Sequence, residues 1–91
     1  MINYLATFKT KDLDIVSSIP NEQVTDFYYD EHTGCGRCYL RYGISSLDLM
    51  KIAQIGLKNN SELHLCVTHI KSGIEQLWEL KDGKSVAYGG R

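Results

Sequence analysis

The sequence has little proline, no excess of either charge and no long apolar run. Pro20 is the only proline among the 91 residues. No stretch approaches the roughly 20 consecutive apolar residues that a membrane-spanning helix needs. Ten Lys and Arg residues oppose eleven Asp and Glu residues, which gives a net charge of −1. This balance argues against a strongly basic nucleic-acid binder and against a strongly acidic mimic of DNA.

Localisation signals are also scarce. Residues 2–9 alternate apolar and polar side chains and lack the basic and then apolar segments of a signal peptide. The three cysteines are an odd number, which is typical of a reducing compartment where thiols stay unpaired. We therefore expect a cytoplasmic protein that does not insert into a membrane.

The composition is that of one globular domain. Apolar residues make up 43% of the chain and charged residues 23%, which excludes global disorder and provides for one modest core. We expect a single domain over 1–91, with residues 88–91 forming a frayed tail. Alternating apolar and polar residues predict its strands, over 2–9, 24–30, 37–43, 62–71, 75–80 and 84–88.

Helical periodicity occurs in two places between these strands. Thr10 is predicted to cap a short helix over 11–18, with Leu13 and Val16 on its buried side. The better helical pattern covers 46–59, where apolar residues recur at the spacing of a helix lying on a sheet. Its cap and apolar positions are Ser45, Leu47, Leu49, Met50, Ile52, Ala53, Gly56 and Leu57.

The order of these elements predicts an α+β fold. It matches the ferredoxin-like βαββαβ arrangement, an antiparallel sheet with helices on one face, followed by a C-terminal β-hairpin. If residues 11–18 form a loop, the alternative is a β-meander with one packed helix. The hairpin either extends the sheet, which would pack Trp78 near the long helix, or projects and leaves Trp78 as a second contact surface.

Cysteine and histidine fall in two short stretches of the chain. Zinc prefers four nitrogen and sulfur ligands, and His32, Cys35 and Cys38 with His69 of the second stretch form a candidate set. The second stretch, however, is predicted to be the middle of a strand, where Cys66 and His69 point to opposite faces. We therefore expect that these cysteines and histidines bind no metal and that the protein has no cofactor. A small domain stapled by zinc is the alternative.

Aromatic and charged side chains gather in the central hairpin over 24–43. Tyr39 and Arg41 should face away from the helices, and Tyr and Arg are enriched at protein-binding hot spots. Acidic neighbours would repel phosphates, so binding of a nucleic acid or nucleotide on this aromatic face is the alternative hypothesis. The candidate partner-binding residues are Tyr28, Tyr29, Asp30, Glu31, Tyr39 and Arg41.

No catalytic motif stands out in the sequence. It contains no Gly-rich phosphate loop, no HExxH motif and no nucleophile elbow, so we expect that the protein is not an enzyme. We expect a protein-binding module, in the form of a small inhibitor or adaptor. Phages and mobile elements carry accessory proteins of this size, including some that block host defences. Exposed edge strands could also pair two copies, which makes a homodimer a further expectation.

Overall fold

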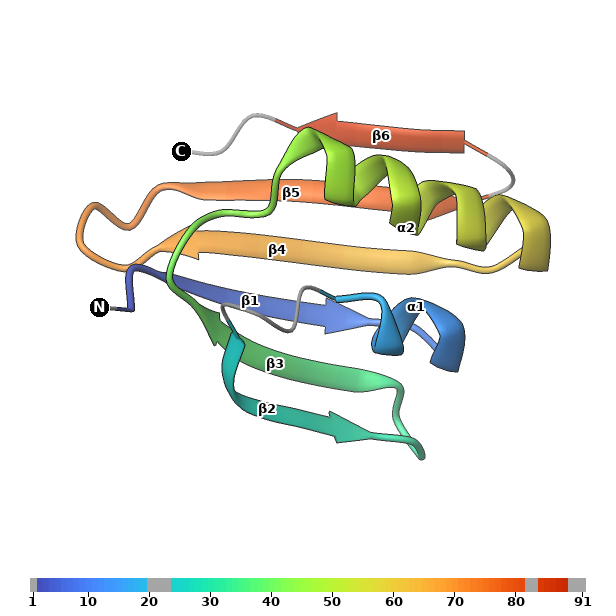
Figure 1. Cartoon of the computed structure of the whole chain (residues 1–91), viewed down its shortest axis with the longest axis horizontal. Helices are drawn as coiled ribbons and strands as arrows, with labels where there is room; N and C mark the ends of the chain where they lie inside the picture. Colours follow the sequence, from blue (N-terminus) through green and yellow to red (C-terminus); the bar gives the residue numbers. More distant parts are fainter. Residues whose placement is uncertain (1, 20–23, 82–83, 89–91) are drawn as a thin grey trace.

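The computed structural model describes residues 2–19, 24–81 and 84–88, and these form an α+β fold (Figure 1). Six strands build one sheet, and α1 and α2 lie on the same face of it. The elements are β1 (Tyr4–Lys9), α1 (Leu13–Ser17), β2 (Val24–Asp30), β3 (Cys35–Leu40), α2 (Ser46–Asn59), β4 (Leu63–His69), β5 (Glu75–Lys81) and β6 (Lys84–Tyr88).

The strands lie in the order β2-β3-β1-β4-β5-β6, and each neighbouring pair is antiparallel. The C-terminal hairpin of β5 and β6 therefore extends the sheet beyond β4 (Figure 1). Trp78 on β5 packs into the core as a result and keeps only 8% of its surface exposed. Residues 82–83, which stand between the two predicted strands of the hairpin, lie outside the described residues, as does the tail from 89 onward. Tyr88, which the prediction included both in the strand over 84–88 and in the tail over 88–91, ends β6.

The core lies between the sheet and the helices. Register pairs place Ala6 of β1 between Cys38 and Val67, and all three side chains are buried on the helix-covered face. Ile15 of α1 and Ile52 of α2 are buried in the same cluster. The remaining buried apolar residues are Phe8, Ile19, Leu40, Leu63, Leu65, Trp78 and Leu80.

Two glycines allow close approaches that a side chain would block. On β3, a Cβ at Gly36 would lie 2.5 Å from Cε2 of Phe8 and 2.9 Å from the carbonyl oxygen of Tyr28. On α2, a Cβ at Gly56 would overlap the side chain of Leu80. Glycine at these positions therefore brings β2 against β3 and α2 against β5.

Helix α1 corrects part of the sequence-based prediction. Its N-cap is Asp12, whose side chain accepts hydrogen bonds from two backbone N–H groups of the first turn. Thr10 is not the cap, because the helix begins at Leu13. The hydroxyl of Thr10 accepts a hydrogen bond from the backbone N–H of Asp12, which precedes the helix, and donates one to the carbonyl oxygen of Glu62 at 2.8 Å. Ile15 is buried in the core and Val16 packs against it partly buried, as predicted for Val16, whereas Leu13 is 54% exposed.

Helix α2 begins and ends as the sequence predicts. The backbone N–H of Asp48 donates to the side chain of the N-cap Ser45, and Asn60 ends the helix in a left-handed conformation with φ 52°. The apolar stripe is narrower than predicted, because Leu47, Met50 and Leu57 are exposed rather than buried. Neither helix in the described part of the chain is long and apolar enough to cross a membrane.

Candidate functional site

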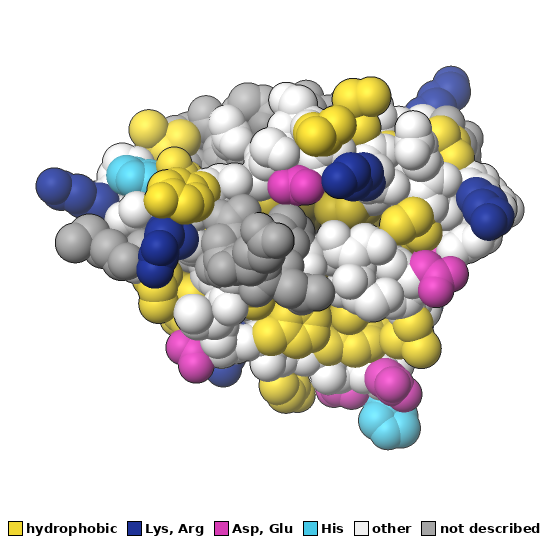
Figure 2. All heavy atoms as spheres, in the orientation of Figure 1, with side chains coloured by type: hydrophobic (Ala, Val, Ile, Leu, Met, Phe, Trp, Pro, Cys, Tyr) yellow, Lys and Arg dark blue, Asp and Glu magenta, His cyan; other side chains and the backbone are white. Residues whose placement is uncertain are grey.

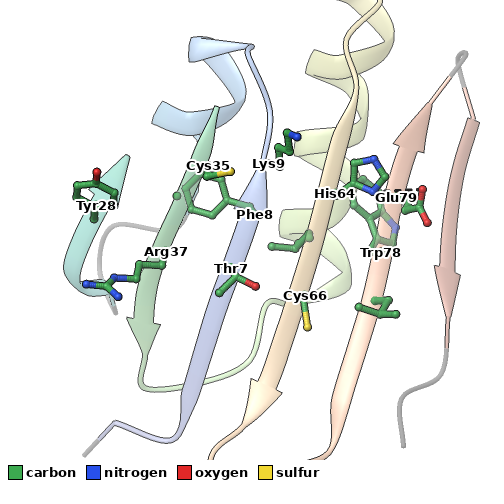
Figure 3. A pocket seen from close by; sticks show the side chains of 13 residues that line it. Thr7, Phe8, Lys9, Tyr28, Cys35, Arg37, His64, Cys66, Trp78 and Glu79 are labelled. Atoms are coloured by element: carbon green, nitrogen blue, oxygen red, sulfur yellow. Dashed lines mark ion pairs between the residues drawn. The ribbon is translucent and has the colours of Figure 1, made fainter. Parts of the chain in front are cut away.

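The face of the sheet opposite the helices is not covered by any described element. We call it the open face, and it holds a groove of about 740 Å³ (Figure 3). Strand pairing arranges its side chains in rows that run across neighbouring strands. The middle row is Tyr28, Arg37, Thr7, Cys66 and Leu77, from β2, β3, β1, β4 and β5.

The middle row combines an aromatic ring, a guanidinium group and an aliphatic side chain. The guanidinium carbon of Arg37 lies 5.9 Å from the centroid of the Tyr28 ring, which is the geometry of a cation–π contact. Tyr28 is 56% exposed and Leu77 is 44% exposed, although both stand in the middle of strands. These side chains can therefore contact a partner without unfolding any element.

A second row lies toward the β2–β3 turn and is mostly polar. The carboxylate of Glu79 lies 3.4 Å from Nδ1 of His64, its register partner, and both side chains are more than a third exposed. Figure 3 shows Lys9, His64 and Glu79 on neighbouring strands at this end of the groove. The row consists of Asp30, Cys35, Lys9, His64 and Glu79.

A third row lies on the other side of the middle row. Its members are Thr25, Tyr39, Leu5, Thr68 and Glu75. Glu75 reaches the middle row, since its carboxylate accepts a 3.8 Å hydrogen bond from the thiol of Cys66.

Charge is divided across the open face. The cations Lys9 and Arg37 stand on β1 and β3, whereas the carboxylates of Glu75 and Glu79 stand on β5. Asp30 adds a carboxylate on β2, where its Oδ1 accepts a hydrogen bond from the backbone of the following turn at 2.9 Å. The basic area on β1 and β3 is thus separated from the acidic area on β5 by the side chains of β4, which are His64, Cys66 and Thr68.

The structure separates the tyrosines that were predicted to bind a partner. Tyr28 and Tyr39 lie on the open face, as predicted for Tyr39. Tyr29 lies on the helix-covered face, where its hydroxyl donates to the carbonyl oxygen of Thr10 at 2.7 Å and its ring stacks with Phe8. Burial, together with the nearby acidic side chains, raises the pKa of Tyr29.

The charged members of the predicted set are also dispersed. Asp30 stands on the open face at the end of β2, and Glu31 lies in the turn after it, where its carbonyl oxygen accepts from Lys11 at 3.3 Å. Arg41 follows the end of β3 and is not part of a row. The arginine that lies on the open face is Arg37 instead of Arg41. Alternation along the strand predicts this position, since Arg37 stands two residues before Tyr39.

The candidate zinc ligands do not come together. Cys35 is exposed on the open face and Cys38 is fully buried on the other, because residues three apart on a strand point to opposite sides. His69 lies at the far end of β1 from Cys35: the register pairs Tyr4 with His69 and Lys9 with Cys35. The described residues contain no group of three or more His, Cys, Asp or Glu side chains suited to a metal ion.

Burial also determines the chemistry of Cys38. Desolvation raises the pKa of its thiol to about 11, which keeps it protonated and unreactive at neutral pH. His64 contacts Glu79, and Cys66 contacts Thr68 and Glu75, so no hydrogen bond in the described residues joins His64 to a thiol. The pairs on the open face stabilise local orientation and do not converge on one reacting position.

A polar cluster joins α1 to the end of α2, beside a second cavity of about 500 Å³. Oδ2 of Asp12 accepts hydrogen bonds from Asn59 at 3.0 Å and from the hydroxyl of Ser61 at 2.5 Å. Partial burial raises the pKa of Asp12, but the hydrogen bonds from Ser61, Asn59 and the backbone lower it by a larger amount. The net shift of the pKa is therefore downward. This cluster is explained by its structural role, since it caps α1 and attaches it to α2.

Comparison of the chain with protein-family models, with curated proteins and with solved structures finds no match. The functional proposal therefore depends on the side chains of the open face.

Proposed function

We propose that the chain binds another protein through the open face and catalyses no reaction. The observation that carries this proposal is the middle row, in which Tyr28, Arg37 and Leu77 are exposed together over a groove. Aromatic and Arg side chains dominate the energetics of many interfaces, and the strands that carry them here lose little backbone entropy on binding. An uncovered sheet face with exposed apolar side chains such as Tyr28 and Leu77 is typical of a binding surface.

The division of charge favours a protein over a nucleic acid. Lys9 and Arg37 could contact phosphates, but Glu75, Glu79 and Asp30 on the same face would repel them. A protein surface can match both areas, with carboxylates toward β1 and β3 and basic side chains toward β5. The expected partner therefore presents an acidic area and a basic area, together with apolar side chains that contact Tyr28 and Leu77.

We also propose that the fold is a ferredoxin-like βαββαβ core extended by β5 and β6. The order β2-β3-β1-β4, with α1 after β1 and α2 after β3, supports this interpretation. In this arrangement both helices cover one face, so the other face is free for binding. The exposed Tyr and Arg side chains of the open face and the absence of a catalytic motif in the sequence favour a cytoplasmic inhibitor or adaptor, of the accessory type that phages and mobile elements use against host defences.

Site-specific photo-crosslinking in the producing cell tests the proposal. A benzophenone amino acid replaces Thr7, at the centre of the middle row, and in a control chain it replaces Lys71, which is exposed in the turn between β4 and β5. We expect a protein adduct from the position of Thr7 and none from that of Lys71. The adduct should disappear in Leu77→Arg, and it should persist in Ile74→Arg, where an equally exposed apolar residue of the turn is changed.

Each other outcome contradicts the proposal. Equal adducts from both crosslinker positions would mean nonspecific contact. An adduct that nuclease removes and protease leaves intact would assign the face to a nucleic acid. An adduct of twice the mass of the chain, formed with a second copy, would assign it to a homodimer.

A further inference from the structure

The outer side of α2 carries an apolar stripe that the core does not use. Leu47, Met50 and Leu57 are 61%, 58% and 50% exposed. Together with Gln54 they stand at spacings of three, four and three residues, which are the a and d positions of a heptad pattern. Such positions line up along one side of a helix and form the seam through which it packs against another helix.

Packing against the sheet does not require this stripe. The side of α2 that faces the core is formed by Ile52 and Gly56, which are buried, with Leu49 and Ala53 partly buried beside them. Single exposed apolar residues are normal on a protein surface. Three of them in heptad register on one 14-residue helix, with Gln54 between Met50 and Leu57, form a stripe that is typical of an interaction site.

The charges beside the stripe are mainly basic. Lys51 and Lys58 are exposed and stand four residues after Leu47 and Gln54, so both lie along the same edge of the seam. Asp48 is the acidic residue of α2, and its carboxylate accepts a 3.0 Å hydrogen bond from the hydroxyl of the N-cap Ser45. Figure 2 shows hydrophobic and basic side chains next to one another over α2.

We propose that this stripe binds an amphipathic helix of a partner protein, one that carries acidic side chains beside its own apolar seam. Opposite charges beside a heptad seam determine which helices pair. A second copy of this chain fits poorly. In an antiparallel pair, Lys51 of one α2 would face Lys58 of the other, and in a parallel pair the lysines would face no carboxylate of the seam.

The inference has its own structural basis and does not depend on the proposed function of the open face. Helix α2 covers one face of the sheet, and the open face is on the other (Figure 1). Two partners could therefore be bound at once without overlap. If both surfaces are occupied, the chain is an adaptor that joins two proteins.

A pair of matched peptides tests the stripe. Each has three heptads, about 21 residues, with Leu at the seam positions, and they differ only in carrying Glu or Lys beside the seam. Repulsion between the flanking charges prevents each peptide from pairing with itself. Fluorescence anisotropy of the labelled peptides should show that the Glu peptide binds the full chain at least about fivefold more tightly than the Lys peptide, as expected for two ion pairs beside an apolar contact.

Variants of α2 identify the surface that binds. The doubly substituted chain K51E/K58E should reverse the preference and bind the Lys peptide more tightly. Met50→Ser with Leu57→Ser should weaken binding of the Glu peptide by at least about tenfold, because the apolar contact is lost. All of these side chains are exposed, so circular dichroism should show unchanged folding. Lys71→Glu, away from the stripe, is the control and should leave the peptide preference unchanged.

Several results would overturn the inference. These are no binding of the Glu peptide up to about 1 mM, equal affinity for the two peptides, or no loss of affinity in the Met50 and Leu57 variant. Sedimentation showing a dimer that Met50→Ser dissociates would mean that a second copy covers the stripe. Because none of these variants touches the open face, crosslinking from the position of Thr7 distinguishes failure of this inference from failure of the proposed function.

Discussion

The guanidinium group of Arg37 lies over the ring of Tyr28, its register partner on the neighbouring strand, with 5.9 Å between the guanidinium carbon and the ring centroid. Both side chains stand on rigid strands and on the face that the helices leave uncovered. The pair is therefore held in place before any partner arrives, which reduces the entropy lost on binding. It forms one end of the middle row on which the proposed function depends.

Removal of this pair should affect binding more than stability. Arg37→Ala and Tyr28→Ala should each lower the free energy of unfolding by less than about 1 kcal/mol, because exposed cation–π contacts contribute little. The same changes should abolish the crosslink from the position of Thr7. Urea titration measures the first effect. A loss above about 2 kcal/mol would instead identify the two residues as part of the packing of the sheet.

Gly36→Ala should destabilise the fold by about 1–3 kcal/mol, as overpacking does in a tight core. The added Cβ would press on the Phe8 ring and lie 2.9 Å from the carbonyl oxygen of Tyr28, which belongs to the backbone of β2 and cannot rotate away. Gly43→Ala is the matched control, since its Cβ would meet only Tyr4 at an ordinary 3.7 Å. Equal melting temperatures for the two variants would contradict this account of the β2–β3 contact.

Asp12 should make the stability depend on pH in the acid range. Its pKa in the folded chain is below the ordinary value of 3.8, because the hydrogen bonds it accepts outweigh the effect of partial burial. The stabilisation by its carboxylate is therefore complete above about pH 4 and is lost as pH falls through the lowered pKa. Asp12→Asn, which can still cap α1, should lower the free energy of unfolding at neutral pH. The loss should become progressively smaller at lower pH.

Thermal unfolding at a series of pH values measures this dependence in both chains. We expect the melting temperatures of wild type and Asp12→Asn to differ at pH 7 and to converge below the lowered pKa. A constant difference across the acid range would show that the carboxylate charge contributes nothing at this position. Asp14→Asn is the control, because its side chain accepts from Asn59 but does not cap the helix.

The rate at which each cysteine is alkylated should depend on the face of the sheet on which it lies and on its burial. Iodoacetamide should modify Cys35 rapidly and Cys66 more slowly in the folded chain, because Cys35 is exposed and Cys66 is partly buried. Cys38 should react only after unfolding, since burial raises its pKa to about 11. Peptide mapping by mass spectrometry distinguishes the three. Rapid labelling of Cys38, or a disulfide between Cys35 and Cys38 under mild oxidation, would contradict the separation of the two thiols.

Local signals in the sequence were sufficient for most elements. The Ser45 cap and the helical spacing of apolar residues define α2, and alternation of apolar and polar residues defines the strands. The prediction that Thr10 caps α1 was wrong, for a reason that local sequence does not contain. Thr10 and Asp12 can both cap a helix. Asp12 is the cap in the structure, where its carboxylate also accepts hydrogen bonds from Asn59 and Ser61, which are distant in sequence.

The candidate site was predicted only in part, since it depends on which strands become neighbours. Alternation along β3 places Tyr39 outward, but only the pairing of β2 with β3, with its bulge between Thr25 and Tyr28, brings Tyr28 beside Arg37. Likewise, the contribution of Leu77 requires that β5 extend the sheet. The spacing of Cys35 and Cys38 suggested a metal turn, whereas their places on a strand put them on opposite faces.

The two thiols of the open face allow the most direct test of the central claim. The measurement is the rate of iodoacetamide labelling of Cys66 in the free chain and in the complex with the protein captured from the position of Thr7. Binding on the open face predicts that Cys66 and Cys35 are labelled far more slowly in the complex. Unchanged labelling of both thiols in a stable complex would show that the partner binds elsewhere and would contradict the account.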